Sequence, residues 1–265
     1  MRRNIIAAAA LALGTRGRSA QAEAPATPDP WPSLAEQIFN DRPIGDGGKV
    51  IEIDAPYRAE DAAVVPVKLH SLQPDDSQGI TQLTLVIDQN PSPLAAQFSP
   101  GRNSGIRTIS TRVRIDSYTN VHAVAALAGG TLVATERFVK AAGGCSAPAA
   151  KEEADAIPLG TMRFRQFATP RPDGRKEAQL MIRHPNYSGM QMDQLTRLYV
   201  PAHFVSSVRL WQGDDLLLSV ESGISIAENP EFRFDYRPNG APDFHAEAHD
   251  SQGKVFKESW PATRA

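Results

Sequence analysis

Short runs of apolar and β-branched residues recur along the chain and predict β-strands. In residues 111–115 polar and apolar side chains alternate one by one, as in a strand with one buried face. The other runs are bounded by turn-forming residues, which is typical of strands in an antiparallel sheet. The predicted strands are residues 50–53, 64–70, 83–87, 109–115, 121–127, 132–139, 162–167, 178–183, 205–211, 216–220, 232–236, 244–249 and 255–260.

Turn signals and one helix signal separate these runs. The Gly129-Gly130 pair predicts a hairpin between residues 121–127 and 132–139. The clusters at residues 212–214 and 250–253 predict further turns. Ser33, with Glu36 three residues later, forms a capping-box pattern and predicts a short helix that ends before Pro43.

The pattern as a whole predicts an all-β fold, with two antiparallel β-sandwiches in tandem and a short N-terminal helix. Residues 23–146 form the first predicted sandwich and residues 161–265 the second. Residues 147–160 are rich in Ala, include two prolines and carry no aromatic side chain, so we expect a linker.

The N-terminus has the pattern of an export signal. Arg2 and Arg3 precede an apolar stretch at residues 5–13, and Ala20-Gln21-Ala22 offers a small-residue cleavage site. We therefore expect residues 1–22 to be a cleaved signal peptide and the mature protein to be periplasmic, with general secretion favoured over export of the folded protein. The formal net charge of −2 and the interspersed charges predict no nucleic-acid partner, and no apolar run is long enough to span a membrane.

The chain has one cysteine, Cys145, in a stretch of small residues. Gly143 and Gly144 precede it and Ser146 follows, so the sequence predicts a thiol on a flexible tether. An odd cysteine in an exported protein suggests a free reactive thiol or intermolecular pairing. An inert, half-buried cysteine is the alternative.

Other residue patterns give no catalytic or cofactor site. The histidines are His70, His122, His184, His203, His245 and His249. His245 and His249 would lie about 13 Å apart in a strand, too far to share a metal ion. We expect structural or interface roles for His184 and His203, loop packing rather than copper binding for Met190 and Met192, and neither a metal nor a cofactor. We also find no Ser-His-Asp set, no phosphate loop and no pair of catalytic carboxylates.

Several motifs resemble the two subunits of a bacterial sulfur-oxidation carrier. In the first half, residues 45–47 (Gly-Asp-Gly), 64–67, 85–93, 110–114 and the Gly-Gly-Cys at 143–145 resemble SoxY. In the second half, residues 182–185 (Ile-Arg-His-Pro), Gly189, 200–204 and 225–230 resemble SoxZ. The order is that of a fused SoxYZ-like protein, the arrangement associated with quinoprotein dehydrogenases.

The resemblance implies two immunoglobulin-like sandwiches that pack through their faces, with Cys145 as the covalent attachment site for sulfur-containing intermediates. It implies a carrier rather than an enzyme. Its partners would be periplasmic sulfur-metabolism enzymes or a quinoprotein dehydrogenase system. Here Ser146-Ala147-Pro148 follows the cysteine and the chain continues, whereas the usual carrier arm ends at this point. A binding adaptor or chaperone with an incidental cysteine is the competing interpretation, and a thiol enzyme would need a base near Cys145.

Overall fold

The computed structural model describes residues 29–73, 79–148, 157–168, 171 and 173–263. The predicted signal peptide, and residues 149–156 of the predicted linker, lie outside the described residues. Within the described part of the chain, no helix has the length and apolar character needed to cross a membrane.

Helix α1 (Trp31–Phe39) begins earlier than the sequence predicts. Pro30 occupies the N-cap position, no side chain caps the helix, and Ser33 lies inside it. Proline favours the first positions of a helix because its fixed φ suits them and its missing N–H is not needed there. The helix ends at Asn40, which has a left-handed φ of 52°, and Phe39 packs against Val124 and Leu132.

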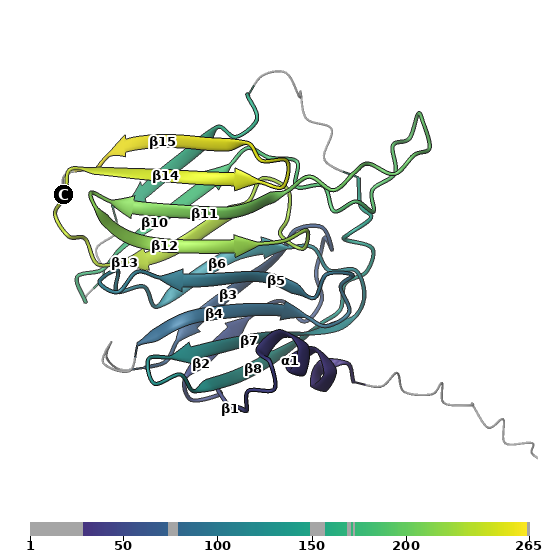
Figure 1. Cartoon of the computed structure of the whole chain (residues 1–265), viewed down its shortest axis with the longest axis horizontal. Helices are drawn as coiled ribbons and strands as arrows, with labels where there is room; N and C mark the ends of the chain where they lie inside the picture. The colour runs from purple at the N-terminus through teal and green to yellow at the C-terminus, as the bar shows by residue number, and fades with distance from the viewer. Residues whose placement is uncertain (1–28, 74–78, 149–156, 169–170, 172, 264–265) are drawn as a thin grey trace, which may run out of the picture.

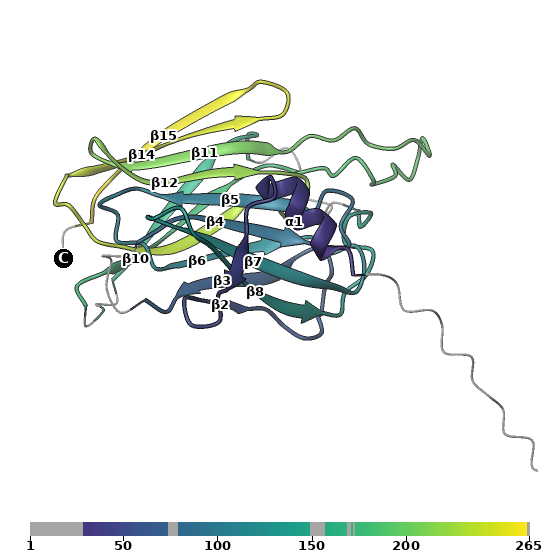
Figure 2. The same ribbon diagram turned by 60° about the horizontal axis from the view of Figure 1, so that its bottom comes forward.

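In the described residues fifteen strands form two sheets, which lie one behind the other in Figure 1. The nine-stranded sheet has the order β1 (Ile44–Asp46), β8 (Leu132–Val139), β7 (Thr119–Leu127), β4 (Ile80–Ile87), β5 (Leu94–Pro100), β12 (Asp215–Ser222), β11 (Val205–Gln212), β14 (Asp243–Asp250), β15 (Val255–Pro261). The six-stranded sheet has the order β2 (Ile51–Asp54), β3 (Val65–Ser71), β6 (Thr108–Val113), β13 (Glu231–Tyr236), β10 (Lys176–Ile182), β9 (Met162–Phe167). All pairings between these strands are antiparallel except that of β1 with β8. Figure 2 shows α1 lying against the nine-stranded sheet.

The predicted all-β sandwich architecture is confirmed, and every predicted strand is present with small differences at its ends. The hairpin predicted at Gly129-Gly130 joins β7 and β8. Strands β1 and β5 were not predicted from the sequence. Strand β1 has three residues, and β5 runs through Ala95 and Ala96 and ends at Pro100, so neither shows a β-branched run.

The resemblance predicts that the two halves pack through their sandwich faces, and this is wrong. They join edge to edge. Strand β5 pairs with β12 in one sheet, and β6 pairs with β13 in the other, so both sheets continue across the junction. Main-chain pairing of this kind covers strand edges that would otherwise be exposed. The hydrophobic core is also continuous, and the rings of Phe98 and Phe232 lie 6.2 Å apart across the junction.

Candidate functional site

Cys145 lies in a turn that follows β8, and its side chain is fully buried, with 0% exposure. The N–H of Gly143 donates to the Asp116 carbonyl at 2.8 Å, and the N–H of Gly144 donates to the Ile115 carbonyl at 2.9 Å. The Ser146 hydroxyl donates to the Gly143 carbonyl at 3.2 Å and closes the turn. The predicted tether residues therefore form a hydrogen-bonded turn in this structure, and the thiol points inward.

The two glycines have a packing role in this turn. Gly143 has a φ of +77°, which favours glycine. A Cβ on Gly144 would lie 2.0 Å from the Ala62 carbonyl oxygen and 2.6 Å from that of Ile115, so no larger residue fits there. Glycine permits a flexible tether, and it also permits the close approach of two backbones. The two glycines alone therefore did not predict the docked conformation.

The second half of the chain supplies the other wall of this site. The hydroxyl of Ser188 lies within hydrogen-bond distance of the Cys145 carbonyl oxygen and 2.9 Å from Gln191 Oε1. Ser188 and Gln191 are 4% and 2% exposed. Neither residue is marked by a pattern in the sequence, because both lie in a loop with no strand period. The docked turn is thus held by residues of both halves.

Arg114 lies directly after β6 and is 1% exposed, which is unusual for an arginine. Its Nη1 donates to the Gly144 carbonyl at 3.3 Å. Its backbone is fixed from both halves, because its N–H donates to the Ser225 carbonyl at 2.8 Å and its carbonyl accepts from Asn90 Nδ2 at 2.7 Å. The guanidinium therefore has a defined position beside the cysteine turn.

These surroundings decide the protonation of the thiol. Burial, followed by the nearby Asp116 carboxylate, raises the pKa of Cys145 to about 11, although the Arg114 guanidinium opposes the shift. The docked sulfur is therefore a protonated thiol at neutral pH. Since the thiolate is the nucleophile, the docked state is chemically unreactive.

The structure brings together two of the histidines for which the sequence predicts structural roles. Nε2 of His203 lies 2.8 Å from Asp250 Oδ2, and Nε2 of His184 lies 3.3 Å from Nε2 of His203 and 3.7 Å from the same carboxylate oxygen. These three atoms are close enough together to hold a metal ion. However, the N–H of Asn186 donates to His184 Nδ1 at 3.1 Å, so the neutral ring carries its proton on Nε2. A metal-binding histidine instead donates from its second nitrogen, and the arrangement therefore fits a hydrogen-bonded network.

The surroundings of His184 also lower its pKa. Burial and the neighbouring His203 lower it to about 4, against the opposing effect of Asp250. His245 and His249 contact different partners. The ring of His245 stacks on Trp211 at 4.9 Å, and His249 interacts with Glu247 at 2.6 Å.

A second polar cluster lies beneath α1 and was not predicted. Nε2 of His122 lies 3.1 Å from Asp88 Oδ2 and 3.3 Å from Glu136 Oε2. The Trp31 ring stacks on the His122 ring at 3.7 Å. The cluster fixes the helix on the sheet, and no motif in the sequence indicates it.

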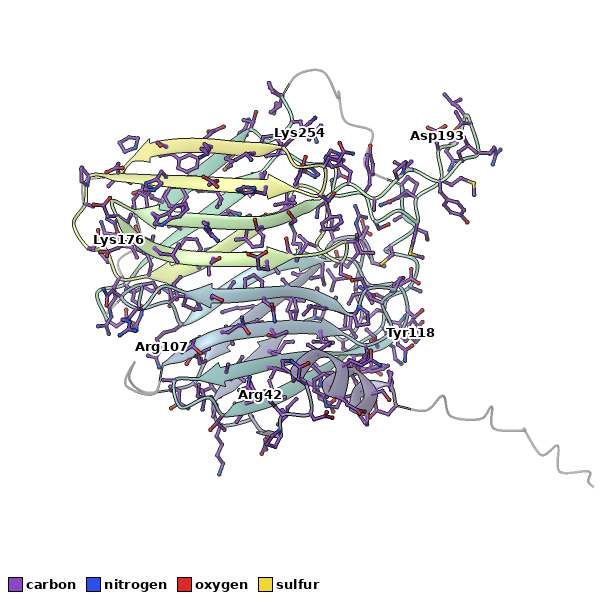
Figure 3. All side chains as sticks on the ribbon, viewed as in Figure 1. Arg42, Arg107, Tyr118, Lys176, Asp193 and Lys254 are labelled. Carbon is purple, nitrogen blue, oxygen red and sulfur yellow. The ribbon has the colours of Figure 1, made fainter. Side chains whose placement is uncertain are left out.

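A hairpin after Gln191 carries the most exposed apolar side chains near the site. It is closed by a bridge between Met192 and Tyr199, and Figure 3 shows Asp193 on this protrusion, at the same side of the molecule as Tyr118. Leu195, Leu198 and Tyr199 are 93%, 68% and 67% exposed. Met192 lies on this surface hairpin and is 38% exposed.

A groove of about 480 Å³ lies on the six-stranded sheet, away from the cysteine turn. Its guanidinium groups are paired: Arg112 with Glu231, Arg171 with Asp235 and Arg233 with Glu177, at 2.9, 3.1 and 2.6 Å. Each of these three guanidinium groups therefore has a carboxylate partner.

Two family models match successive parts of this chain. Residues 35–145 match the family model of the sulfur oxidation protein SoxY, and residues 164–261 match that of the sulphur oxidation protein SoxZ. A search among curated proteins finds no match. Among solved structures, a superoxide reductase (neelaredoxin) from Ignicoccus hospitalis is 13% identical over 41% of this chain and 90% of its own, with a TM-score of 0.31, too low to carry an argument. The family matches show that this chain joins a SoxY domain and a SoxZ domain in one polypeptide.

Proposed function

We propose that the chain is a periplasmic carrier that holds sulfur-containing groups on Cys145 and presents them to partner enzymes. The observation that supports this most directly is the position of the only cysteine. It is the last residue of the SoxY match, and the turn that contains it is contacted by both domains. The partners would be periplasmic sulfur-metabolism enzymes or a quinoprotein dehydrogenase system, with residues 1–22 as the export signal.

In this proposal the carrier alternates between two states. In the docked state the thiol is buried and its pKa is raised to about 11, which protects it from unwanted oxidation. In the released state the turn leaves its site, and the thiol regains an ordinary pKa and can react. Release would break the hydrogen bonds that Gly143 and Gly144 donate to the carbonyls of Asp116 and Ile115, just after β6.

A binding adaptor with an incidental cysteine is the second candidate. The observation that favours it is the same burial, because a buried thiol with a raised pKa is typical of inert structural cysteines. The exposed apolar hairpin at residues 192–199 would then be the working surface.

Intact-protein mass spectrometry distinguishes the two candidates. The protein is isolated without reductant from cells grown on reduced sulfur compounds, alongside the Cys145→Ser variant. A carrier shows sulfur-containing adducts on the wild type and none on the variant. If the wild type carries only free thiol and the variant supports the same growth, the adaptor is the function.

A further inference from the structure

The cysteine turn docks on a short backbone segment that follows β6, residues 114–116 (the docking segment). The carbonyl of Ile115 accepts the N–H of Gly144 at 2.9 Å. The carbonyl of Asp116 accepts the N–H of Gly143 at 2.8 Å. These two bonds hold the residues directly before the thiol, so the turn can dock only while the docking segment keeps its position.

A buried asparagine bonds both ends of the docking segment. Asn90 lies in the turn after β4 and is 5% exposed. Its Oδ1 accepts the N–H of Asp116 at 2.9 Å, and its Nδ2 donates to the carbonyl of Arg114 at 2.7 Å. Because Oδ1 faces a backbone N–H, which can only donate, the orientation of the amide is fixed. The Asn90 side chain therefore replaces water as the hydrogen-bond partner of this irregular backbone.

The same side chain also reaches the SoxZ domain. Nδ2 of Asn90 donates to the hydroxyl of Ser225 at 2.9 Å, and this hydroxyl donates to the carbonyl of Ser92 at 2.8 Å. The carbonyl of Ser225 accepts the N–H of Arg114 at 2.8 Å. Ser225 is 0% exposed and belongs to the SoxZ match, whereas the other three residues belong to the SoxY match. Ser225 is thus bonded to the docking segment both directly and through Asn90.

We propose that Asn90 is a positioning residue for the carrier thiol and that Ser225 links it to the SoxZ domain. The inference rests on the proposed carrier function and specifies its regulation: the SoxZ domain sets how often the cysteine turn leaves its site. Without the Asn90 side chain, the Arg114 carbonyl and the Asp116 N–H lose a buried partner. The docking segment then shifts to regain hydrogen bonds with water, and the turn loses its acceptors.

The rate of iodoacetamide labelling of Cys145 tests this in the folded full-length chain. It is measured by intact mass at several urea concentrations below the unfolding transition. Release of the turn alone exposes little surface and depends weakly on urea, whereas labelling through global unfolding rises steeply with urea. In Asn90→Ala, labelling without urea should rise about tenfold, the effect of one buried hydrogen bond, and its dependence on urea should be weak.

Gln212→Ala is the matched control, because it removes another buried amide that bonds two backbone groups. Gln212 is 2% exposed and ends β11; its Oε1 accepts the N–H of Asn239 at 3.2 Å, and its Nε2 donates to the carbonyl of Ala241 at 3.1 Å. The control should lower the free energy of unfolding without faster labelling in the absence of urea. Unchanged labelling in Asn90→Ala, an equal increase in both variants, or a steep dependence on urea would overturn the proposal.

Ser225→Ala tests the link between the domains and decides the proposal if Asn90→Ala does not fold. It leaves two bonds of Asn90 in place, so labelling should rise about threefold. Because both substitutions break the same bond, the double variant should label within about twofold of Asn90→Ala. Multiplied effects, or no effect of Ser225→Ala, would overturn the link. The reagent labels the thiol chemically, so the result is independent of whether cells load Cys145, which the mass measurement above decides.

Discussion

Substitution of Gly144 by alanine should convert the docked thiol into a reactive one. The added Cβ would lie 2.0 Å from the Ala62 carbonyl oxygen, a backbone atom that cannot move aside cheaply, so the turn must leave its site. The pKa of Cys145 then falls from about 11 toward its ordinary value of 9.0. Each pH unit is a factor of ten in the thiolate fraction, so that fraction at pH 7 rises about 100-fold. Loss of steric cover adds to this increase.

The assay is the rate of iodoacetamide labelling at pH 7, followed by intact mass, with circular dichroism to confirm that the variant is folded. Gly129→Ala is the matched control, because a Cβ at that glycine meets nothing within 4 Å and the residue lies in an exposed hairpin. The control should label like the wild type. If Gly144→Ala labels within about twofold of the wild type, the docked turn does not control thiol reactivity and the reasoning fails.

Other consequences of the structure can be checked in the same way. Phe98→Ala, at the junction of the domains, should lower the free energy of unfolding by about 3–5 kcal/mol. Because both sheets are shared, the variant should still unfold in a single transition. Two separate transitions in urea would contradict this. Labelling of wild-type Cys145 should keep rising from pH 8 to pH 11, since the raised pKa keeps the docked thiol protonated until its value of about 11 is reached; a plateau near pH 9 would show an undocked thiol. Asp250→Ala should destabilise the protein by at least about 1–3 kcal/mol, because it leaves His203 and two backbone N–H groups without their acceptor; a melting temperature equal to that of the wild type would refute this role.

The strand content was predictable because most strands pack one face and expose the other. In β2 and β3, buried and exposed residues alternate, and this alternation is visible in the sequence. Strand β5 was not predictable because two of its three buried residues are alanines, which favour no strand on their own, and Phe98 alone gives no alternating pattern. Missing β5 also hid the junction, since β5 is the strand that pairs with β12 across a gap of more than a hundred residues.

The candidate site was predictable only in part. The rarity of Cys145 and its glycine neighbours singled it out, and Arg114 stands at the end of the motif at residues 110–114. The docking of the Cys145 turn depends on Ala62 and Ser188, which are distant in sequence and belong to loops with no periodic pattern. A glycine pair is compatible with both a mobile tether and a tight turn, and tertiary contacts determine which of the two is stable.

The most direct test of the carrier account is the intact mass of the protein isolated without reductant from cells oxidising sulfur compounds. The account predicts a fraction of molecules with added sulfur-containing mass that disappears on reduction and is absent from the Cys145→Ser variant. Unmodified thiol in every molecule, under conditions where the protein is needed for growth, would contradict it.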